Sequence, residues 1–160
     1  MSKLPVISNL SHLQAYARFF AEMTPETLGS MKHLLADDVV FNDPFNSLHG
    51  SDAFVAIFTH MYDVMENPRF DILDVAASEK AGYIKWHMTG ALRVRPSFHI
   101  DLIGMSEVHF NDAGLITTHC DHWDSAHQLL AKFPVIGWLV RQLLSIFAIQ
   151  SSKTVISGKR

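Results

Sequence analysis

Apolar residues recur every three or four positions through the first third of the chain, which is the spacing of one face of an α-helix. This pattern predicts a first helix over about 8–23. Thr24, Pro25 and Glu26 then form a typical helix start, with an N-cap, a proline at the first helical position and an acid in the first turn. A third helix is predicted from Gly50 and Ser51 to about 66.

After Arg69 the apolar spacing changes to two, which is typical of β-strands. Strands are predicted at about 70–76, 82–95, 98–110 and 115–123, with a short earlier strand at 39–41. Turn-forming residues separate consecutive runs, so the later strands are expected to pair as antiparallel hairpins. Helices followed by a strand meander predict an α+β fold, in which the helices cover one face of a curved antiparallel sheet.

The last segment is the most apolar part of the chain. Residues 133–149 carry only Arg141, Gln142 and Ser145 as a narrow polar stripe, which predicts an apolar C-terminal helix that must bury its surface. It can cover the open end of the fold, join a dimer interface, or lie on a membrane surface. The membrane-surface alternative is disfavoured because the helix contains a single cation, Arg141. We expect one domain over 1–132, to which the helix and polar tail of 133–160 also belong.

Composition narrows the class of protein. The 160 residues are 48% apolar and 18% charged, which fits one soluble globular domain. The formal charge of −3 lacks the basic excess of a nucleic-acid binder. Cys120 is the single cysteine, so an internal disulfide and paired-cysteine motifs are excluded. Together with an N-terminal sequence that does not resemble a signal peptide, this predicts a cytoplasmic protein.

Two segments carry a resemblance to a known superfamily. The first is Leu-Ala-Asp-Asp-Val-Val-Phe-Asn-Asp-Pro at 35–44, followed by Gly50, and the second runs over 110–124. Their order, with the helices and strands around them, is similar to the nuclear-transport-factor-2-like superfamily over roughly 8–125. That superfamily includes ketosteroid isomerases and SnoaL-like polyketide cyclases. The resemblance implies a cone-shaped, cystatin-like sheet wrapped around three N-terminal helices, and a homodimer formed through the convex sheet face.

The resemblance to ketosteroid isomerases also implies roles for individual residues. Their catalytic base aligns with Asp43, directly before Pro44. The residue that supplies the aromatic hydroxyl of their oxyanion hole aligns with Phe19 if the alignment has no gap. It aligns with Tyr16 if the loop after the first helix is three residues longer in this chain. The protonated acid that completes this hole aligns with Ser106, so that donor is replaced here by a weaker acid.

Alternation along the strands predicts which side chains share the interior. If Ser106 faces inward, as the resemblance implies, Val108 does too, and the same argument groups His119 with Asp121. The set expected to bind a ligand comprises Tyr16, Phe19, Phe58, Trp86, Met88, Ser106, Val108 and Trp123. An apolar cavity with a few convergent polar groups is typical of a small-molecule site.

The candidate catalytic residues are Asp43, Asp121 and His119. Two partly desolvated carboxylates can act as base and acid on a hydrophobic carbonyl compound, as in an isomerase, cyclase or dehydratase, without a cofactor. Alternatively, Asp43 stabilises its loop through an Asx turn and Asp121 only pairs with His119. The cavity then holds an apolar ligand or lipid without turnover, or is vestigial in an interaction module. No metal site is predicted, because alternation turns His122 away from the other two.

Overall fold

The computed structural model describes residues 6–148, and it begins with the helix α1 (Val6–Glu22). The second helical segment is the 3₁₀ helix η1 (Leu28–Leu34), where an α-helix starting near Thr24 was predicted. A hydrogen-bonded turn comes first, in which the Thr24 carbonyl accepts bonds from the backbone N–H groups of Thr27 and Leu28. The Ser30 hydroxyl also donates to the Thr27 carbonyl, and such side-chain bonds compete with regular helix. The third helix, α2 (Ser51–Val64), confirms its prediction.

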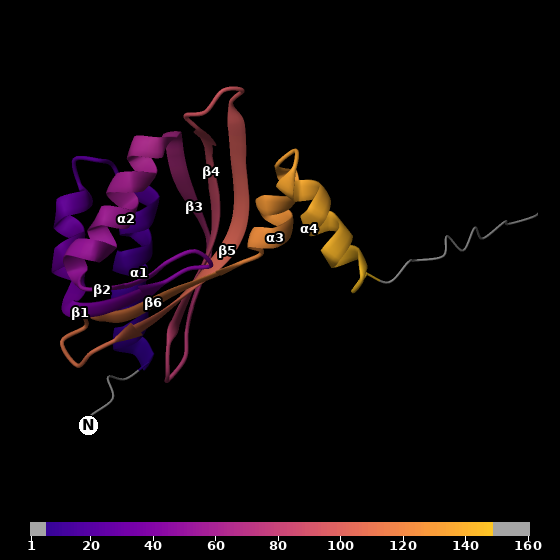
Figure 1. The fold of residues 1–160 in the computed structure, drawn as a ribbon. Coiled ribbons are helices and arrows are strands. Elements are labelled where there is room, and N and C mark those ends of the chain that lie inside the picture. Colours follow the sequence, from indigo (N-terminus) through magenta and orange to yellow (C-terminus); the bar gives the residue numbers. More distant parts are fainter. Residues whose placement is uncertain (1–5, 149–160) are drawn as a thin grey trace, which may run out of the picture. The chain divides into compact units, whose positions relative to one another are not determined.

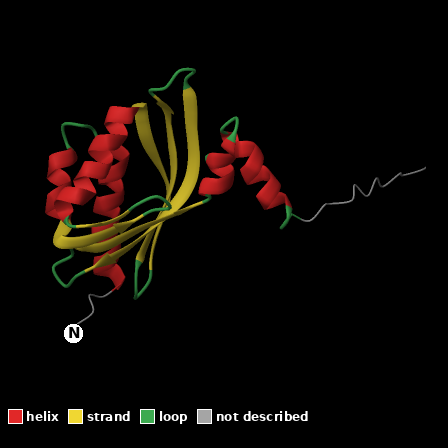
Figure 2. Cartoon of the chain, viewed as in Figure 1, coloured by secondary structure: helices red, strands yellow, loops and turns green. Residues whose placement is uncertain are grey.

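Six strands form one curved, open sheet (Figure 1). The strands are β1 (Leu35–Asn42), β2 (Ser47–His49), β3 (Met65–Ala77), β4 (Gly82–Leu92), β5 (Phe98–Phe110) and β6 (Ile116–Trp123). Their order is β2-β1-β6-β5-β4-β3. The β1–β6 pair is parallel and the other pairs are antiparallel. Helices α1 and α2 cover one face of this sheet (Figure 2), so the predicted α+β fold is confirmed.

Several boundaries differ from the predicted ones. Strand β1 is longer than 39–41, and β2 was not predicted. Strand β3 begins directly after α2 and runs through Asn67 and Pro68, where only a helix end was expected. Asn67 has a φ of 48°, and the pairing of β3 with β4 shifts between Glu66 and Arg69. A β-bulge at an asparagine, which tolerates positive φ, therefore lets the strand continue past the proline.

The inner face of the sheet follows the predicted alternation. On β5, the buried residues are Ile100, Leu102, Gly104, Ser106 and Val108, and none of the residues between them is buried. Val108 is opposite His119 on β6, and Ser106 is opposite Asp121. The largest fully buried side chains on the helices include Tyr16 and Phe54. The core therefore lies between the helices and the inner face of the sheet.

The chain divides into two compact units between Asp124 and Ser125. The second contains α3 (Ser125–Gln128), η2 (Leu130–Lys132) and α4 (Ile136–Ser145). Helix α4 is shorter than the predicted 133–149, since Phe133 precedes a proline and is extended, with φ −73° and ψ 141°. Ile149 and the polar tail to 160 lie outside the described residues. In residues 6–148, no helix combines the length and apolar character needed to span a membrane. The assignment of 133–160 to the same domain as 1–132 stays a prediction.

Candidate active site around Asp121

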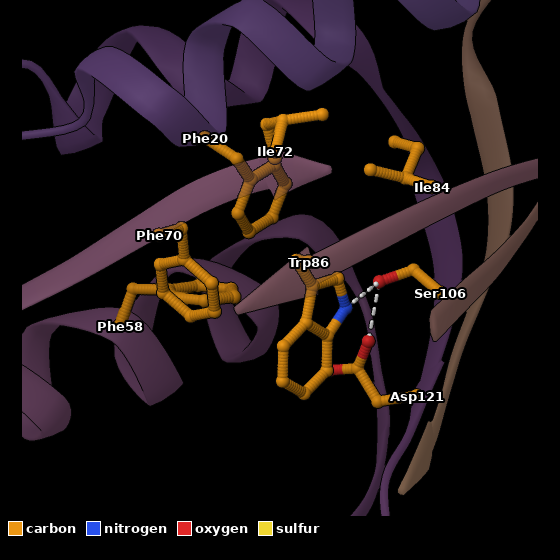
Figure 3. A pocket seen from close by; sticks show the side chains of 8 residues that line it. All are labelled: Phe20, Phe58, Phe70, Ile72, Ile84, Trp86, Ser106 and Asp121. Carbon is orange, nitrogen blue, oxygen red and sulfur yellow. Dashed lines mark hydrogen bonds between the residues drawn. The ribbon is translucent and has the colours of Figure 1, made fainter. Parts of the chain in front are cut away.

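Two chains of hydrogen bonds meet at one carboxylate oxygen, Oδ1 of Asp121. In the first chain, the Tyr16 hydroxyl lies 2.9 Å from His119 Nδ1, and His119 Nε2 lies 2.9 Å from Asp121 Oδ1. In the second, the Trp86 indole N–H donates to Ser106 Oγ at 2.9 Å, and the Ser106 hydroxyl donates to the same carboxylate oxygen at 2.5 Å (Figure 3). We call these five residues the polar network.

The sheet register positions four members of this network. Ser106 and Asp121 are direct cross-strand partners on β5 and β6. His119 lies two residues before Asp121, so both side chains leave the same face of β6. Trp86 pairs with Gly104, two residues before Ser106, which brings its indole ring across β5. Tyr16 completes the network from the sheet-facing side of α1.

Donor and acceptor chemistry fixes the direction of both chains. An indole N–H can only donate, so Ser106 accepts from Trp86 and uses its own proton toward Asp121. With Asp121 ionised, His119 donates from Nε2 and accepts the Tyr16 hydroxyl proton at Nδ1. This arrangement gives a partner to the Tyr16 hydroxyl, to both ring nitrogens of His119, to the Trp86 N–H and to the Ser106 hydroxyl.

His119 is held in an almost entirely aromatic environment. Its ring stacks with the rings of Phe41 and Phe20, at centroid distances of 5.3 and 5.7 Å, and meets the edge of Phe54 at 5.4 Å. His119 and Tyr16 are each only 1% exposed. Burial, and next the negative charge of Asp121, raises the pKa of Tyr16 well above its ordinary value. The Tyr16 hydroxyl therefore stays protonated and remains a donor at physiological pH.

Asp121 also faces a small apolar cavity. The cavity is lined by Phe20, Phe58, Phe70, Ile72, Ile84, Trp86, Ser106 and Asp121 (Figure 3). Its free volume is about 10 Å³, which is room for about one water molecule. The side chain of Asp121 is 17% exposed, so its carboxylate keeps some contact with solvent. The predicted apolar wall is present, but aromatic rings fill most of the space that a ligand needs.

The structure brings only part of the predicted site together. Phe58, Trp86, Ser106 and Asp121 line the cavity, and Tyr16 and His119 belong to the polar network. Met88 and Val108 are buried in the core of the sheet. Phe19 is half-buried and does not line the cavity, so Tyr16 is the residue of that pair at the polar network. Trp123 packs against Phe45, with ring centroids 5.6 Å apart.

Asp43 lies in the loop after β1, and its carboxylate is occupied there. Oδ1 accepts hydrogen bonds from the backbone N–H of Phe45 at 2.7 Å and of Asn46 at 2.6 Å, and from the Asn46 side chain at 3.0 Å. This is the Asx-turn arrangement that the sequence left open. Asp43 is not among the residues that line the Asp121 cavity. Its role as a base stays a prediction.

Four cavity residues were missed by the sequence prediction. Ile84 lies two residues before Trp86, and Phe70 and Ile72 alternate on β3, so strand alternation alone predicts a shared face for each pair. Phe20 belongs to the apolar face of the first predicted helix. What alternation does not predict is how far along each strand the cavity extends.

Two further reactive side chains, those of His122 and Cys120, alternate with His119 and Asp121 along β6. His122 Nε2 is 3.5 Å from a carboxylate oxygen of Glu107, away from His119 and Asp121. Burial raises the pKa of the Cys120 thiol, and the charges of Asp121 and Glu107 raise it further, which makes this thiol a poorer nucleophile. Among the described residues, no three or more His, Cys, Asp and Glu side chains are grouped to hold a metal ion.

Removal of the Tyr16 hydroxyl is expected to change the response of stability to alkaline pH. Because the pKa of Tyr16 is raised in the folded state, the unfolded chain loses this proton first, above about pH 10. The folding stability of the native protein then falls by about 1.4 kcal/mol per pH unit on account of this group. Tyr16→Phe is expected to be less stable than the native protein at pH 8, with a deficit that shrinks above pH 10. Urea unfolding across this range measures it, and a constant deficit contradicts the prediction.

Gly104 gives the Trp86 ring its space, and Gly104→Ala is expected to destabilise the fold. A Cβ at this position would lie 2.4 Å from the Trp86 ring and 3.0 Å from Cβ of Trp123. The buried indole would have to move away from Ser106, at an overpacking cost of about 1–3 kcal/mol in unfolding free energy. Gly29→Ala is the matched control, because nothing lies within 4 Å of its added Cβ. Equal unfolding midpoints for the two variants would refute this account.

Comparisons with known proteins come from a family model and from solved structures. A comparison with curated proteins finds no match. Among solved structures, a protein from Jannaschia sp., provisionally named a SnoaL-like polyketide cyclase, has a TM-score of 0.67 at 10% identity, covering 84% of this chain and 99% of its own. A steroid delta-isomerase from Pseudomonas aeruginosa has a TM-score of 0.58 at 21% identity, covering 91% and 99%.

A protein with a ketosteroid isomerase-like fold from Catenulispora acidiphila, solved in complex with trimethylamine, has a TM-score of 0.62 at 17% identity, covering 76% of this chain and 90% of its own. Likenesses at such low identity establish the fold. The model of the SnoaL-like domain family matches residues 16–119, from the tyrosine of the polar network to its histidine. Because this match spans well over half of the sequence, the chain belongs to the SnoaL-like domain family.

Proposed function

We propose that the protein is an enzyme that moves a proton on a hydrophobic carbonyl compound, as an isomerase, cyclase or dehydratase, with Asp121 as the proton-transferring group. One observation carries this proposal. Both hydrogen bonds to the Asp121 carboxylate end on Oδ1, and no hydrogen bond from the described residues reaches Oδ2. A carboxylate held by one oxygen beside an apolar cavity can use the other as a general base.

The polar network supports the base in two ways. Ser106 and His119 fix the orientation of the carboxylate, so Oδ2 is presented in one geometry. Proton removal next to a carbonyl also places negative charge on the carbonyl oxygen, which needs a donor. Once Asp121 is protonated it no longer needs two donors on Oδ1, and the Ser106 hydroxyl becomes available to the enolate oxygen. This reaction type requires no cofactor.

The size of the cavity sets a condition on this function. A free volume of about 10 Å³ does not hold a carbonyl compound, so Phe20, Phe58 and Phe70 must turn aside when a substrate enters. The same observation favours the second candidate, in which the cavity is vestigial and the polar network only satisfies buried groups. A non-catalytic binder of an apolar ligand or lipid needs the same opening of the cavity as the enzyme.

The outer face of the sheet supports a proposal about assembly. It presents a hydrogen bond between His87 and Asp101, 2.8 Å long, and another between His109 and Glu107. Ile103, which is 50% exposed, lies on the same face. A face that mixes apolar and charged side chains is suited to pairing with a second copy, so we propose a homodimer through this surface. We also propose that the protein works in the cytoplasm.

The test follows proton exchange on a probe ketone, 2-tetralone, in deuterated water. An enzyme of this kind is expected to exchange the protons next to the carbonyl faster than buffer alone. Thermal shifts with a panel of hydrophobic ketones, fatty acids and sterols report binding separately, because a ligand of the folded state raises its stability. Binding without exchange identifies a binder. If the protein shows no binding and no exchange, the result favours the vestigial cavity.

A further inference from the structure

An exposed row of large apolar side chains runs along α4 and the residues directly after it. Ile136, Leu139, Leu143, Ile146 and Phe147 are spaced at i, i+3, i+7, i+10 and i+11, which places them within an arc of about 100° on a helix of 3.6 residues per turn. Their exposed fractions range from 54% to 85%. We call these five residues the apolar stripe.

The other side of α4 is fixed to its own unit. Gly137 is buried, and a Cβ there would lie 2.4 Å from the Ala131 carbonyl oxygen, so the backbones of α4 and η2 are in close contact. Arg141 donates a hydrogen bond to the same carbonyl. Val140 and Leu144, which lie between these residues and the stripe, are half-buried. The apolar stripe therefore points away from η2.

The charges of the chain are divided unevenly between its two compact units, whose boundary in the sequence lies between Asp124 and Ser125. All sixteen acidic residues lie at or before Asp124, whereas five of the thirteen basic residues follow it. Those five are Lys132, Arg141, Lys153, Lys159 and Arg160. The formal charge is therefore −8 for residues 1–124 and +5 for residues 125–160. The single cation within the helix understates the positive charge of the whole segment.

We propose that the apolar stripe binds the surface of a membrane rich in anionic phospholipid, to which the net positive charge of residues 125–160 attracts this segment. A helix of ten residues is about 15 Å long, which is too short to cross a bilayer and enough to lie in its plane. Two copies meeting stripe to stripe would bring two segments of the same positive charge together, which opposes that pairing. An anionic lipid surface complements both the apolar stripe and the positive charge of residues 125–160.

Flotation of the full-length protein with lipid vesicles tests this proposal. We expect binding to phosphatidylcholine vesicles that contain roughly a third phosphatidylserine, much weaker binding to phosphatidylcholine alone, and release as salt rises from about 0.1 M to about 0.5 M. Leu139→Gln with Leu143→Gln is expected to weaken binding at least tenfold, because two apolar side chains no longer enter the lipid. Ile146→Gln with Phe147→Gln, beyond the end of α4, is expected to act in the same direction.

Trp138→Gln is the matched control. It also replaces a large exposed apolar side chain by glutamine, but Trp138 is 61% exposed and lies outside the apolar stripe. Its effect on binding is expected to be less than threefold. Equal loss in this control, equal binding to both vesicle types, or no binding overturns the proposal. So does a stripe variant that instead turns a dimer into a monomer by light scattering, or that lowers the melting temperature, because the stripe is then covered by protein.

Discussion

Asp121→Asn is expected to lower the enzyme-catalysed exchange of 2-tetralone protons by about 10²- to 10⁴-fold, which is the usual contribution of a general base. Asparagine has nearly the same shape and keeps an oxygen that can accept from Ser106 and His119, so the polar network can persist. It cannot take up a proton at the position of Oδ2. Exchange rates from proton NMR, with circular dichroism to verify the fold, give the measurement.

Asp38→Asn is the matched control for this variant. It makes the same chemical change at an exposed position on β1, so exchange is expected to equal that of the native protein. Asp43→Asn addresses the competing assignment, because the resemblance implies Asp43 as the base. If Asp43→Asn abolishes exchange while Asp121→Asn retains it, the assignment of the base to Asp121 is wrong.

The face of each strand could be predicted from the sequence because it depends on a local rule. Ser106, Val108, His119 and Trp86 are buried on the inner face as alternation predicts, since successive residues of a strand leave opposite faces. The break before α4 also has a local cause, because Pro134 forces Phe133 into an extended conformation, but the predicted helix over 133–149 missed it. These are effects between near neighbours in the chain.

The contacts of the site depend on distances that no local rule supplies. Tyr16 and His119 are 103 residues apart, and their hydrogen bond requires one register of α1 over the sheet. The free volume beside Asp121 depends on how Phe20, Phe58 and Phe70 pack from two helices and a strand. A pattern of apolar positions predicts that these rings are inside. It does not predict whether they leave room for a ligand.

The polar network has an energetic consequence that is separate from catalysis. Its donors and acceptors lie inside an aromatic core, where an unpartnered polar group costs about 1–3 kcal/mol. Each member is tolerated there because another member satisfies it. Removing one member is therefore expected to cost more than removing a matched pair.

His119→Phe is expected to lower the unfolding free energy by roughly 2–4 kcal/mol, because it leaves the buried Tyr16 hydroxyl without an acceptor and takes a donor from Asp121. Phenylalanine keeps a flat ring between Phe20 and Phe41, so the aromatic packing is largely retained. The double variant with Tyr16→Phe removes the orphaned hydroxyl. It is therefore expected to be more stable than His119→Phe alone by about 1 kcal/mol.

Urea unfolding of the native protein, both single variants and the double variant at neutral pH gives the coupling energy directly. Tyr16→Phe alone is expected to be destabilising, because His119 Nδ1 then lacks its donor. Tyr16→Phe is thus expected to lower the unfolding free energy of the native protein but to raise that of His119→Phe. Any packing strain from the phenylalanine ring that replaces the imidazole is common to the His119→Phe single and double variants, so it cancels in their difference. If the effects of the two substitutions simply add, the Tyr16–His119 hydrogen bond does not link these residues energetically.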